Sequence, residues 1–322
     1  MDNVLYVVVP CYNEEAVLPE TSERLKAKFQ SLIEKKMISK DSRVAFVNDG
    51  SKDKTWEIIC ELHDRDVMFS GINLSRNRGH QNALLAGLMT VADKADMVIS
   101  MDADLQDDIN AMDEMIEKYQ KGCDVVYGVR SKRAKDSFFK KTTAEFFYKL
   151  LKVFGVETVY NHADYRLLSK RALEALAGFK EVNLFLRGMI PMLGFKTDIV
   201  YYERGERFAG ESKYPLSKMM SFALEGITSL SVKPIRMITG LGILVFLVSI
   251  GILIYSLVRH FTGHTIQGWT TLMVSTWAIG GLILLCLGIV GEYVGKIYLE
   301  TKARPRFVIE EFLDGEKEKT EK

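Results

Sequence analysis

Two aspartates separated by one small residue, Asp102 and Asp104, form the arrangement in this chain that most clearly suggests chemistry. They follow a short apolar run, Met97–Met101, which is typical of a buried strand. Carboxylate oxygens are hard ligands that suit Mg²⁺ or Mn²⁺, and a cation held there can also take diphosphate oxygens. A solvated turn would give the same three-residue pattern, so the surroundings of the pair decide between the two interpretations.

Polar clusters also follow the other apolar runs in the first third of the chain. The clusters are Pro10–Glu14, Asn48–Ser51, Ser75–Gly79 and Asp102–Asp107, and they follow Val4–Val9, Val44–Val47, Val67–Leu74 and Met97–Met101. In open α/β sheets, ligands bind outside the carboxyl ends of the strands. Four clusters on one edge therefore predict a site. Within it, Asp49 can accept hydrogen bonds from a base or ribose, or it can cap the Asn-Asp-Gly turn.

The elements that must position these residues alternate between strand and helix up to about residue 130. Helical spacing occurs in Glu14–Lys36, Lys54–His63, Asn82–Ala92 and Ala111–Tyr119, and Asp124–Gly128 is a further strand. This rhythm predicts an α/β fold with a doubly wound, mostly parallel sheet. Beyond it we expect a helix over Ser137–Gly155, a helix beginning near Ser169 as N-cap, a strand over Phe195–Tyr202 and a loop over Glu203–Tyr214.

The C-terminal third has the pattern of a membrane anchor. Pro215–Leu230 has one apolar helical face and is expected to lie along the membrane surface, although a core helix of the soluble domain would show the same face. Two charge-free stretches follow, with expected spans at Met237–Val258 and Thr270–Gly291. Each is long enough to cross a hydrocarbon core of ~30 Å. The predicted units are a domain at 1–214, an interfacial helix at 215–232, a transmembrane hairpin at 233–296 and a tail at 297–322.

Charge and composition exclude several classes of protein and fix the expected orientation. Lysine and arginine flank the two spans on the domain side, so both termini and the domain are expected in the cytoplasm. The 322 residues carry a net charge of +1, which gives no general field for nucleic acid. The four cysteines have no C-x-x-C spacing, so neither a disulfide framework nor a zinc site is expected. The acidic start at Met1-Asp2 and the lack of a basic region favour a first strand over a signal peptide.

Several motifs in order identify a resemblance. VVVPCYNEE, FVNDGSKDKT, LSRNRGHQNAL, MDADLQDD, NHADYRLLSKRAL and NLFLRGM occur as in family 2 glycosyltransferases with the GT-A fold. The chain resembles most closely the polyprenyl-phosphate glycosyltransferases, which include dolichol-phosphate mannose synthase-like enzymes and bactoprenol glucosyltransferases. The resemblance covers residues 4 to about 305, and the two-helix hairpin favours the bactoprenol branch.

The resemblance implies a role for particular residues. The residues implied to bind the nucleotide sugar are Pro10, Tyr12, Glu14, Asp49 and Asp102, and those implied to hold the metal, Mg²⁺ or Mn²⁺, are Asp102 and Asp104. The implied catalytic residues are Asp164, Asp104 and Arg187. The residues implied to bind the acceptor phosphate are Arg204, Arg207 and Lys213. For Asp164, a salt bridge to Arg166 or a turn cap is the alternative. We call Glu203–Tyr214, which contains Arg204, Arg207 and Lys213, the basic loop; its alternative role is that of a solvated surface. His80 is expected only as a hydrogen-bonding residue at a helix N-terminus.

The activity that the resemblance implies is inverting transfer of a hexose from a nucleotide sugar to polyprenyl (undecaprenyl) phosphate. It would take place at the cytoplasmic face of the inner (plasma) membrane and serve cell-envelope glycosylation. UDP-glucose is the leading donor, while UDP-N-acetylglucosamine, other UDP-hexoses and GDP-mannose stay open, as does a homo-oligomer. A processive polysaccharide synthase is one alternative, but its Q-x-x-R-W motif is absent. A non-catalytic membrane sensor or scaffold for nucleotide sugars is another.

Overall fold

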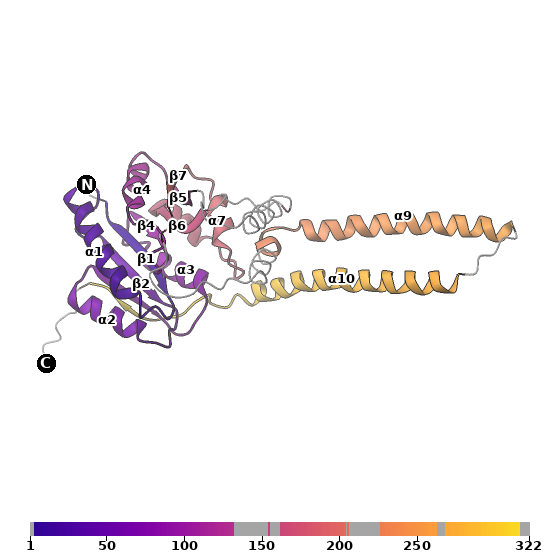
Figure 1. The fold of residues 1–322 in the computed structure, drawn as a ribbon, viewed down its shortest axis with the longest axis horizontal. Helices are drawn as coiled ribbons and strands as arrows, with labels where there is room; N and C mark the ends of the chain where they lie inside the picture. The colour runs from indigo at the N-terminus through magenta and orange to yellow at the C-terminus, as the bar shows by residue number, and fades with distance from the viewer. Residues whose placement is uncertain are drawn as a thin grey trace.

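The computed structural model describes residues 3–131, 154, 162–203, 205, 226–262 and 268–315. It has an α/β domain at one end and a pair of long helices that extends from it (Figure 1). Some predicted features lie wholly or largely outside the described residues. These are the helix over Ser137–Gly155, the interfacial helix before residue 226, and Arg204, Arg207 and Lys213 of the basic loop.

In the described part of the chain, eight strands form one mixed sheet. They are β1 (Leu5–Cys11), β2 (Arg43–Asn48), β3 (Phe69–Leu74), β4 (Met97–Ser100), β5 (Val125–Arg130), β6 (His162–Ser169), β7 (Thr197–Tyr202) and β8 (Ile309–Leu313), in the order β7-β5-β6-β4-β1-β2-β3-β8. The pairs β4–β1, β1–β2, β2–β3 and β5–β7 are parallel, while β6 and β8 run antiparallel to their neighbours. The prediction of a mostly parallel α/β sheet is therefore confirmed.

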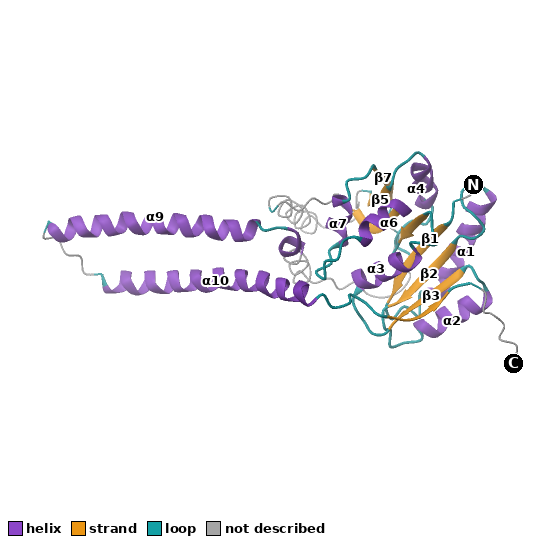
Figure 2. Cartoon of the chain, turned by 180° about the vertical axis from the view of Figure 1, so that it is seen from behind, coloured by secondary structure: helices purple, strands orange, loops and turns teal. Residues whose placement is uncertain are grey.

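Helices cover both faces of the sheet, because successive residues of each central strand point to opposite sides. Val7 and Val9 of β1 belong to the core that includes α1 (Leu18–Glu34), α2 (Thr55–Arg65) and α4 (Ala111–Gln120). Tyr6 and Val8 belong to the core on the other face. That core includes α3 (His80–Val91), α6 (Lys170–Ala177) and α7 (Leu186–Met192). Figure 2 shows the resulting helix–sheet–helix layers.

The position of α3 depends on a glycine. A Cβ at Gly87 would lie 2.4 Å from Cγ1 of Val8 and 2.7 Å from Cγ2 of Val47, closer than real side chains come. Since only glycine leaves this space, α3 packs directly onto β1 and β2. Its first residue, His80, is thereby brought to the carboxyl edge of the sheet.

The strand β6 was not among the predicted elements, although the helix after it was. Ser169 caps α6 as expected, since its Oγ accepts a hydrogen bond from the Ala172 nitrogen at 3.1 Å. β6 inserts between β4 and β5, with Ser100 paired to Arg166. Arg166 is fully buried in the middle of this strand and interrupts its apolar pattern. Because of this charged residue, the apolar pattern did not predict a strand here.

The two predicted spans lie within α9 (Lys233–Phe261) and α10 (Trp269–Lys302), which run side by side (Figure 1). Both are long and apolar enough to cross a membrane. Many of their large apolar side chains are exposed, including Leu247 and Leu284 at 60% and 70%.

After α10 the chain returns to the domain, and β8 joins the sheet beside β3. From the sequence, only a tail was predicted at 297–322. β8 was missed because its exposed glutamates give it no apolar run. Asp314 fixes this end of the chain, because it accepts hydrogen bonds from Ser70 at 2.9 Å and Lys94 at 2.6 Å.

Candidate active site

The loops after β1, β2 and β3 are joined by hydrogen bonds at the carboxyl edge of the sheet. The Asn13 nitrogen donates to Ser51 Oγ at 3.0 Å, and the Lys52 nitrogen donates to Asn13 Oδ1 at 2.9 Å. A Cβ at Gly50 would lie 2.5 Å from the Asn77 nitrogen, and Gly50 has a φ of +62°, so glycine is required there. The first three of the four predicted clusters on this edge are therefore in contact with one another.

Asp49 holds two of these loops together. Its carboxylate oxygens accept hydrogen bonds from the Arg78 nitrogen at 2.6 Å and the Gly79 nitrogen at 2.9 Å, and the residue is 3% exposed. Burial raises the pKa of Asp49 although both hydrogen bonds lower it. The structure thus gives Asp49 a capping contact, across the loop before α3 and not within its own turn. Its predicted contact with a nucleoside stays a prediction.

The other residues predicted to bind the nucleotide sugar lie at the end of β1. Pro10 is within the strand and buried, Tyr12 just beyond it is 44% exposed, and Glu14 is partly buried. Tyr12 therefore offers an accessible aromatic ring at the end of β1. The Glu14 nitrogen donates to Thr55 Oγ1 at 2.9 Å, which ties this loop to α2.

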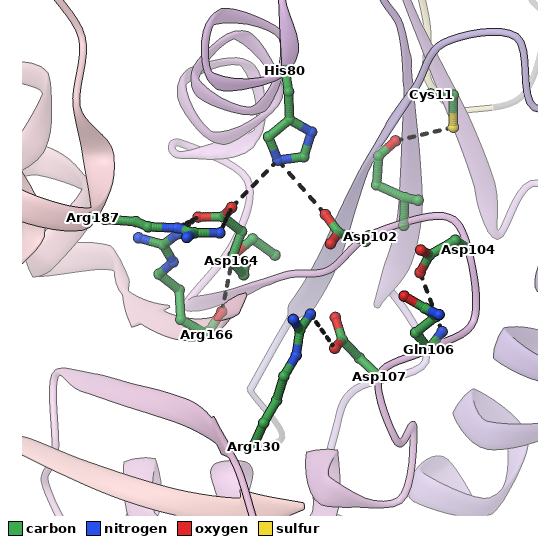
Figure 3. A network of polar contacts seen from close by, with 12 residues as sticks. Cys11, His80, Asp102, Asp104, Gln106, Asp107, Arg130, Asp164, Arg166 and Arg187 are labelled. Carbon is green, nitrogen blue, oxygen red and sulfur yellow. Dashed lines mark hydrogen bonds and ion pairs between the residues drawn. The ribbon is translucent and has the colours of Figure 1, made fainter. Parts of the chain in front are cut away.

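Four carboxylates gather beyond β4, and we call Asp102, Asp104, Asp107 and Asp164 the acid cluster (Figure 3). Asp104 Oδ1 accepts a hydrogen bond from the Gln106 nitrogen at 3.2 Å, which shapes the loop. Burial raises the pKa of Asp102 to about 6, where the neighbouring carboxylates also raise it and His80 lowers it. The cluster therefore concentrates negative charge at the end of β4.

Asp164 comes from β6 and is held by two arginines. Arg187, on α7, donates to both of its oxygens, from Nε at 3.2 Å and from Nη2 at 2.8 Å. Arg166 donates from Nη2 to Oδ1. The salt bridge to Arg166 that the sequence analysis kept as the alternative is therefore present. Burial raises the pKa of Asp164, but the charges of Arg187 and Arg166 bring it well below its usual range.

His80 lies between Asp102 and Asp164 of the acid cluster. It was not predicted as a site residue. Its Nε2 lies 3.6 Å from Asp102 Oδ1 and 3.7 Å from Asp164 Oδ2 (Figure 3). Burial lowers the pKa of His80, yet the two aspartates raise it above its ordinary value. Its position as first residue of α3 was the available signal, but the partners are 22 and 84 residues away in the sequence.

Asp107 is the second residue that sequence reasoning missed. It is buried, and its Oδ1 accepts hydrogen bonds from the Tyr202 hydroxyl at 2.5 Å and from Arg130 Nη2 at 3.3 Å. Its Oδ2 is buried and has no hydrogen-bond partner in the described part of the chain. These contacts anchor the Asp102–Asp107 loop to β5 and β7.

The donor chemistry of the acid cluster fits a divalent cation. Among the described residues, no three acidic, histidine or cysteine side chains form a ready-made metal cage. Mg²⁺ commonly binds through one or two carboxylates together with substrate phosphates. Asp102 and Asp104 supply two carboxylates of this kind on one loop.

The fold and this edge of the sheet define an α/β domain with an acidic loop at the carboxyl end of β4. Residues 6–177 match the description "Glycosyl transferase family 2". The chain belongs to this family and is a glycosyltransferase.

Two relatives and one solved structure illustrate the similarity. The chain is 51% identical to "Uncharacterized glycosyltransferase YkoT" of Bacillus subtilis (strain 168), over 95% of this chain and 91% of the relative. It is 39% identical to "Bactoprenol glucosyl transferase" of Shigella phage SfV, over 94% and 97%. The structure of glucosyl-3-phosphoglycerate synthase from Mycobacterium tuberculosis with Mn²⁺, UDP-glucose and phosphoglyceric acid matches 71% of this chain and 78% of its own. For that match the TM-score is 0.45 and the identity 16%.

Proposed function

We propose that this protein transfers a hexose, from UDP-glucose in the first instance, to undecaprenyl phosphate at the cytoplasmic face of the plasma membrane. The observation that carries the proposal is the acid cluster beside Arg166 and Arg187, in a chain that also has two long apolar helices, α9 and α10. The similarity to bactoprenol glucosyl transferases supports the choice of lipid acceptor. In this proposal α9 and α10 cross the membrane, and residues 215–232 lie along its surface.

Asp102 and Asp104 would hold Mg²⁺ or Mn²⁺, which stabilises negative charge on the diphosphate of the donor when it is bound. Tyr12 offers a ring on which the base can stack, and Pro10 and Glu14 complete that side of the pocket. Asp49 keeps the loop before α3 in place. Because both oxygens of Asp49 already accept backbone hydrogen bonds, we assign it a positioning role beside the nucleoside.

The transfer joins a phosphate oxygen of the acceptor to the anomeric carbon of the sugar. The bond from that carbon to the donor diphosphate breaks, and its electron pair leaves with UDP. In-line attack inverts the anomeric configuration. A phosphate monoester has a second pKa of about 6, so the attacking oxygen is already largely ionised near neutral pH.

Asp164 is therefore proposed as a positioning residue and not as a base. Its pKa lies well below the usual range, so it is a weak proton acceptor. Through two hydrogen bonds it aligns Arg187, whose side chain is 33% exposed, whereas that of Arg166 is 1% exposed. Arg187 is thus the arginine that can meet a substrate phosphate.

The basic loop begins beside the acid cluster. The Gly205 nitrogen donates to the Gln106 carbonyl oxygen at 2.9 Å, so the chain that leaves β7 passes the Asp104 loop. Arg204, Arg207 and Lys213 follow from this point. We propose that they bind the acceptor phosphate between the acid cluster and the membrane.

Incubation of the purified protein with labelled sugar nucleotides and undecaprenyl phosphate tests the proposal. We expect label from UDP-glucose in the lipid phase, and much less from UDP-N-acetylglucosamine or GDP-mannose. The matched control is Asp108→Asn, on the same loop as Asp102→Asn but outside the acid cluster. Asp108→Asn should keep activity and Asp102→Asn should lose it. No label in lipid from any donor would reject the proposal.

A further inference from the structure

A cavity of about 410 Å³ lies where the C-terminal end of α10 meets the α/β domain. Arg76 and Arg78, from the loop between β3 and α3, line one side. Lys302, Arg304 and Arg306, from the end of α10 and the segment after it, line the other. We call these five residues the basic pocket. Its volume is in the range of ligand sites, about 300–1,000 Å³.

The charge of the basic pocket is largely uncompensated. No carboxylate is among the described residues that line it. In the described part of the chain, Arg76, Arg78, Lys302 and Arg304 form no salt bridge, and the buried Nε of Arg78 has no hydrogen-bond partner. The Lys302 ammonium lies over the ring of Tyr298, 4.2 Å from its centroid.

Two glutamates lie near Arg306 without neutralising the pocket. Glu300 accepts hydrogen bonds from the backbone nitrogens of Val182 and Asn183, each at 2.8 Å, so its carboxylate is directed at that loop. Glu181 also acts on Arg306, whose pKa burial lowers and both glutamates raise. Arg306 itself donates to the Phe179 carbonyl oxygen at 3.0 Å. The charge of Arg78 also acts on the carboxylate of Asp49, whose pKa it lowers. Arg306 and Arg78 are thus partly compensated, while Arg76, Lys302 and Arg304 form no salt bridge among the described residues.

We propose that the basic pocket binds the phosphate group of an anionic phospholipid, as a site separate from the acid cluster. Guanidinium groups match the geometry of phosphate oxygens, and clusters of lysine and arginine next to a membrane helix attract anionic lipids. Leu299 and Val308, 47% and 48% exposed, line the same cavity and offer apolar contact to the start of an acyl chain. The lipid as source rests on the proposed function, in which α10 spans the membrane.

The loop between β3 and α3 connects this pocket to the active site. Its arginines line the basic pocket, while His80, at the start of α3, faces Asp102 and Asp164. Asp49 fixes the same loop through the Arg78 nitrogen. A bound headgroup would therefore join α10 to the loop that carries His80, and so hold the domain against the membrane surface.

Thermal unfolding of the purified full-length protein in a neutral detergent tests the proposal. The probes are dioctanoyl phosphatidylglycerol, dioctanoyl phosphatidylcholine and glycerol 3-phosphate. The pocket variant is Arg78→Gln/Arg304→Gln. The control is Arg24→Gln/Arg65→Gln, which removes two exposed arginines from α1 and α2. Near saturation, phosphatidylglycerol should raise the Tm of the wild type and the control by about 5 °C or more. Phosphatidylcholine should not.

The pocket variant should lose most of this rise while its affinity for UDP, measured by calorimetry, stays within about twofold of wild type. If the double variant is unstable without lipid, Arg304→Gln alone, at an exposed position, replaces it. An equal rise in pocket variant and control, an equal rise with both lipids, or no rise in the wild type would overturn the proposal. So would a loss of UDP binding with an unchanged lipid response. If glycerol 3-phosphate matches phosphatidylglycerol, the phosphate site stands and the lipid assignment is wrong. None of these readouts requires glycosyl transfer, so a failure here is distinct from a failure of the proposed function.

Discussion

Replacement of Asp164 with alanine is expected to lower the stability of the domain as well as its activity. Arg166 is fully buried, and its Nε and Nη1 have no hydrogen-bond partner among the described residues. Asp164 is therefore the main compensation for this buried charge. Removal of one partner of a buried ion pair costs about 3–5 kcal/mol. At roughly 2–4 °C per kcal/mol, the Tm should fall by about 10 °C.

A second substitution separates structure from catalysis. Asp164→Ala/Arg166→Met removes both charges, and apolar replacement of a buried ion pair is often neutral. The double variant should therefore recover most of the lost Tm, yet stay inactive because Arg187 is no longer aligned. Arg187→Met is the matched control. That side chain is 33% exposed, so its loss should change stability by about 1 kcal/mol or less while transfer is lost.

The assays are thermal unfolding in detergent and transfer of labelled sugar to undecaprenyl phosphate. Two results would refute this reasoning. One is a Tm of Asp164→Ala equal to that of wild type, which would mean that Arg166 does not depend on Asp164. The other is an active Asp164→Ala/Arg166→Met variant, which would mean that Asp164 does not position Arg187.

Three further predictions concern the metal, the C-terminal strand and the basic loop. EDTA should abolish transfer and Mg²⁺ or Mn²⁺ should restore it, in wild type and in Asp108→Asn; full turnover of purified protein in EDTA would exclude the metal role. Burial raises the pKa of Asp314, but hydrogen bonds from Lys94 and Ser70 bring it below the ordinary value. The ionised Asp314 therefore stabilises the folded state above about pH 4, and this stabilisation is lost as the pH falls further. Asp314→Asn should therefore lower the Tm by a few degrees at pH 7, and the gap to wild type should narrow as the pH falls below about 4. A gap that stays constant over this range would contradict this. Arg207→Ala and Lys213→Ala should each lower lipid glycosylation by about tenfold or more, because a phosphate contact to a cation contributes about 1.5–3 kcal/mol. UDP-glucose binding should change much less. Unchanged glycosylation would indicate that the basic loop is a solvated surface.

The sequence predicted the elements whose burial is uniform. β1 and β4 are continuous apolar runs because both faces of the sheet are covered, and that pattern is readable without tertiary information. β6 was not predicted, since buried Arg166 breaks its pattern and only the contact with Asp164 accounts for the charge. β8 is an edge strand with exposed side chains, so nothing in its composition distinguishes it from a polar tail.

Some residues of the candidate site could likewise be predicted from the sequence, and others could not. Asp102 and Asp104 are recognisable because their chemistry depends on spacing within one loop. The roles of His80 and Asp107 depend on partners from other elements, and no local pattern encodes those contacts. For Asp49, local chemistry allowed a turn cap or a nucleoside contact. The structure shows a cap of a different loop, which only the packing of α3 through Gly87 could determine.

Mass spectrometry of the lipid product tests whether this protein transfers a hexose to undecaprenyl phosphate. Purified protein is incubated with UDP-glucose and undecaprenyl phosphate, and released UDP is measured alongside the lipid. We expect one hexose on each modified lipid phosphate, one UDP released per hexose, and an anomeric configuration opposite to that of the donor. Sugar in a growing polymer, UDP released without modified lipid, or a retained configuration would contradict this expectation.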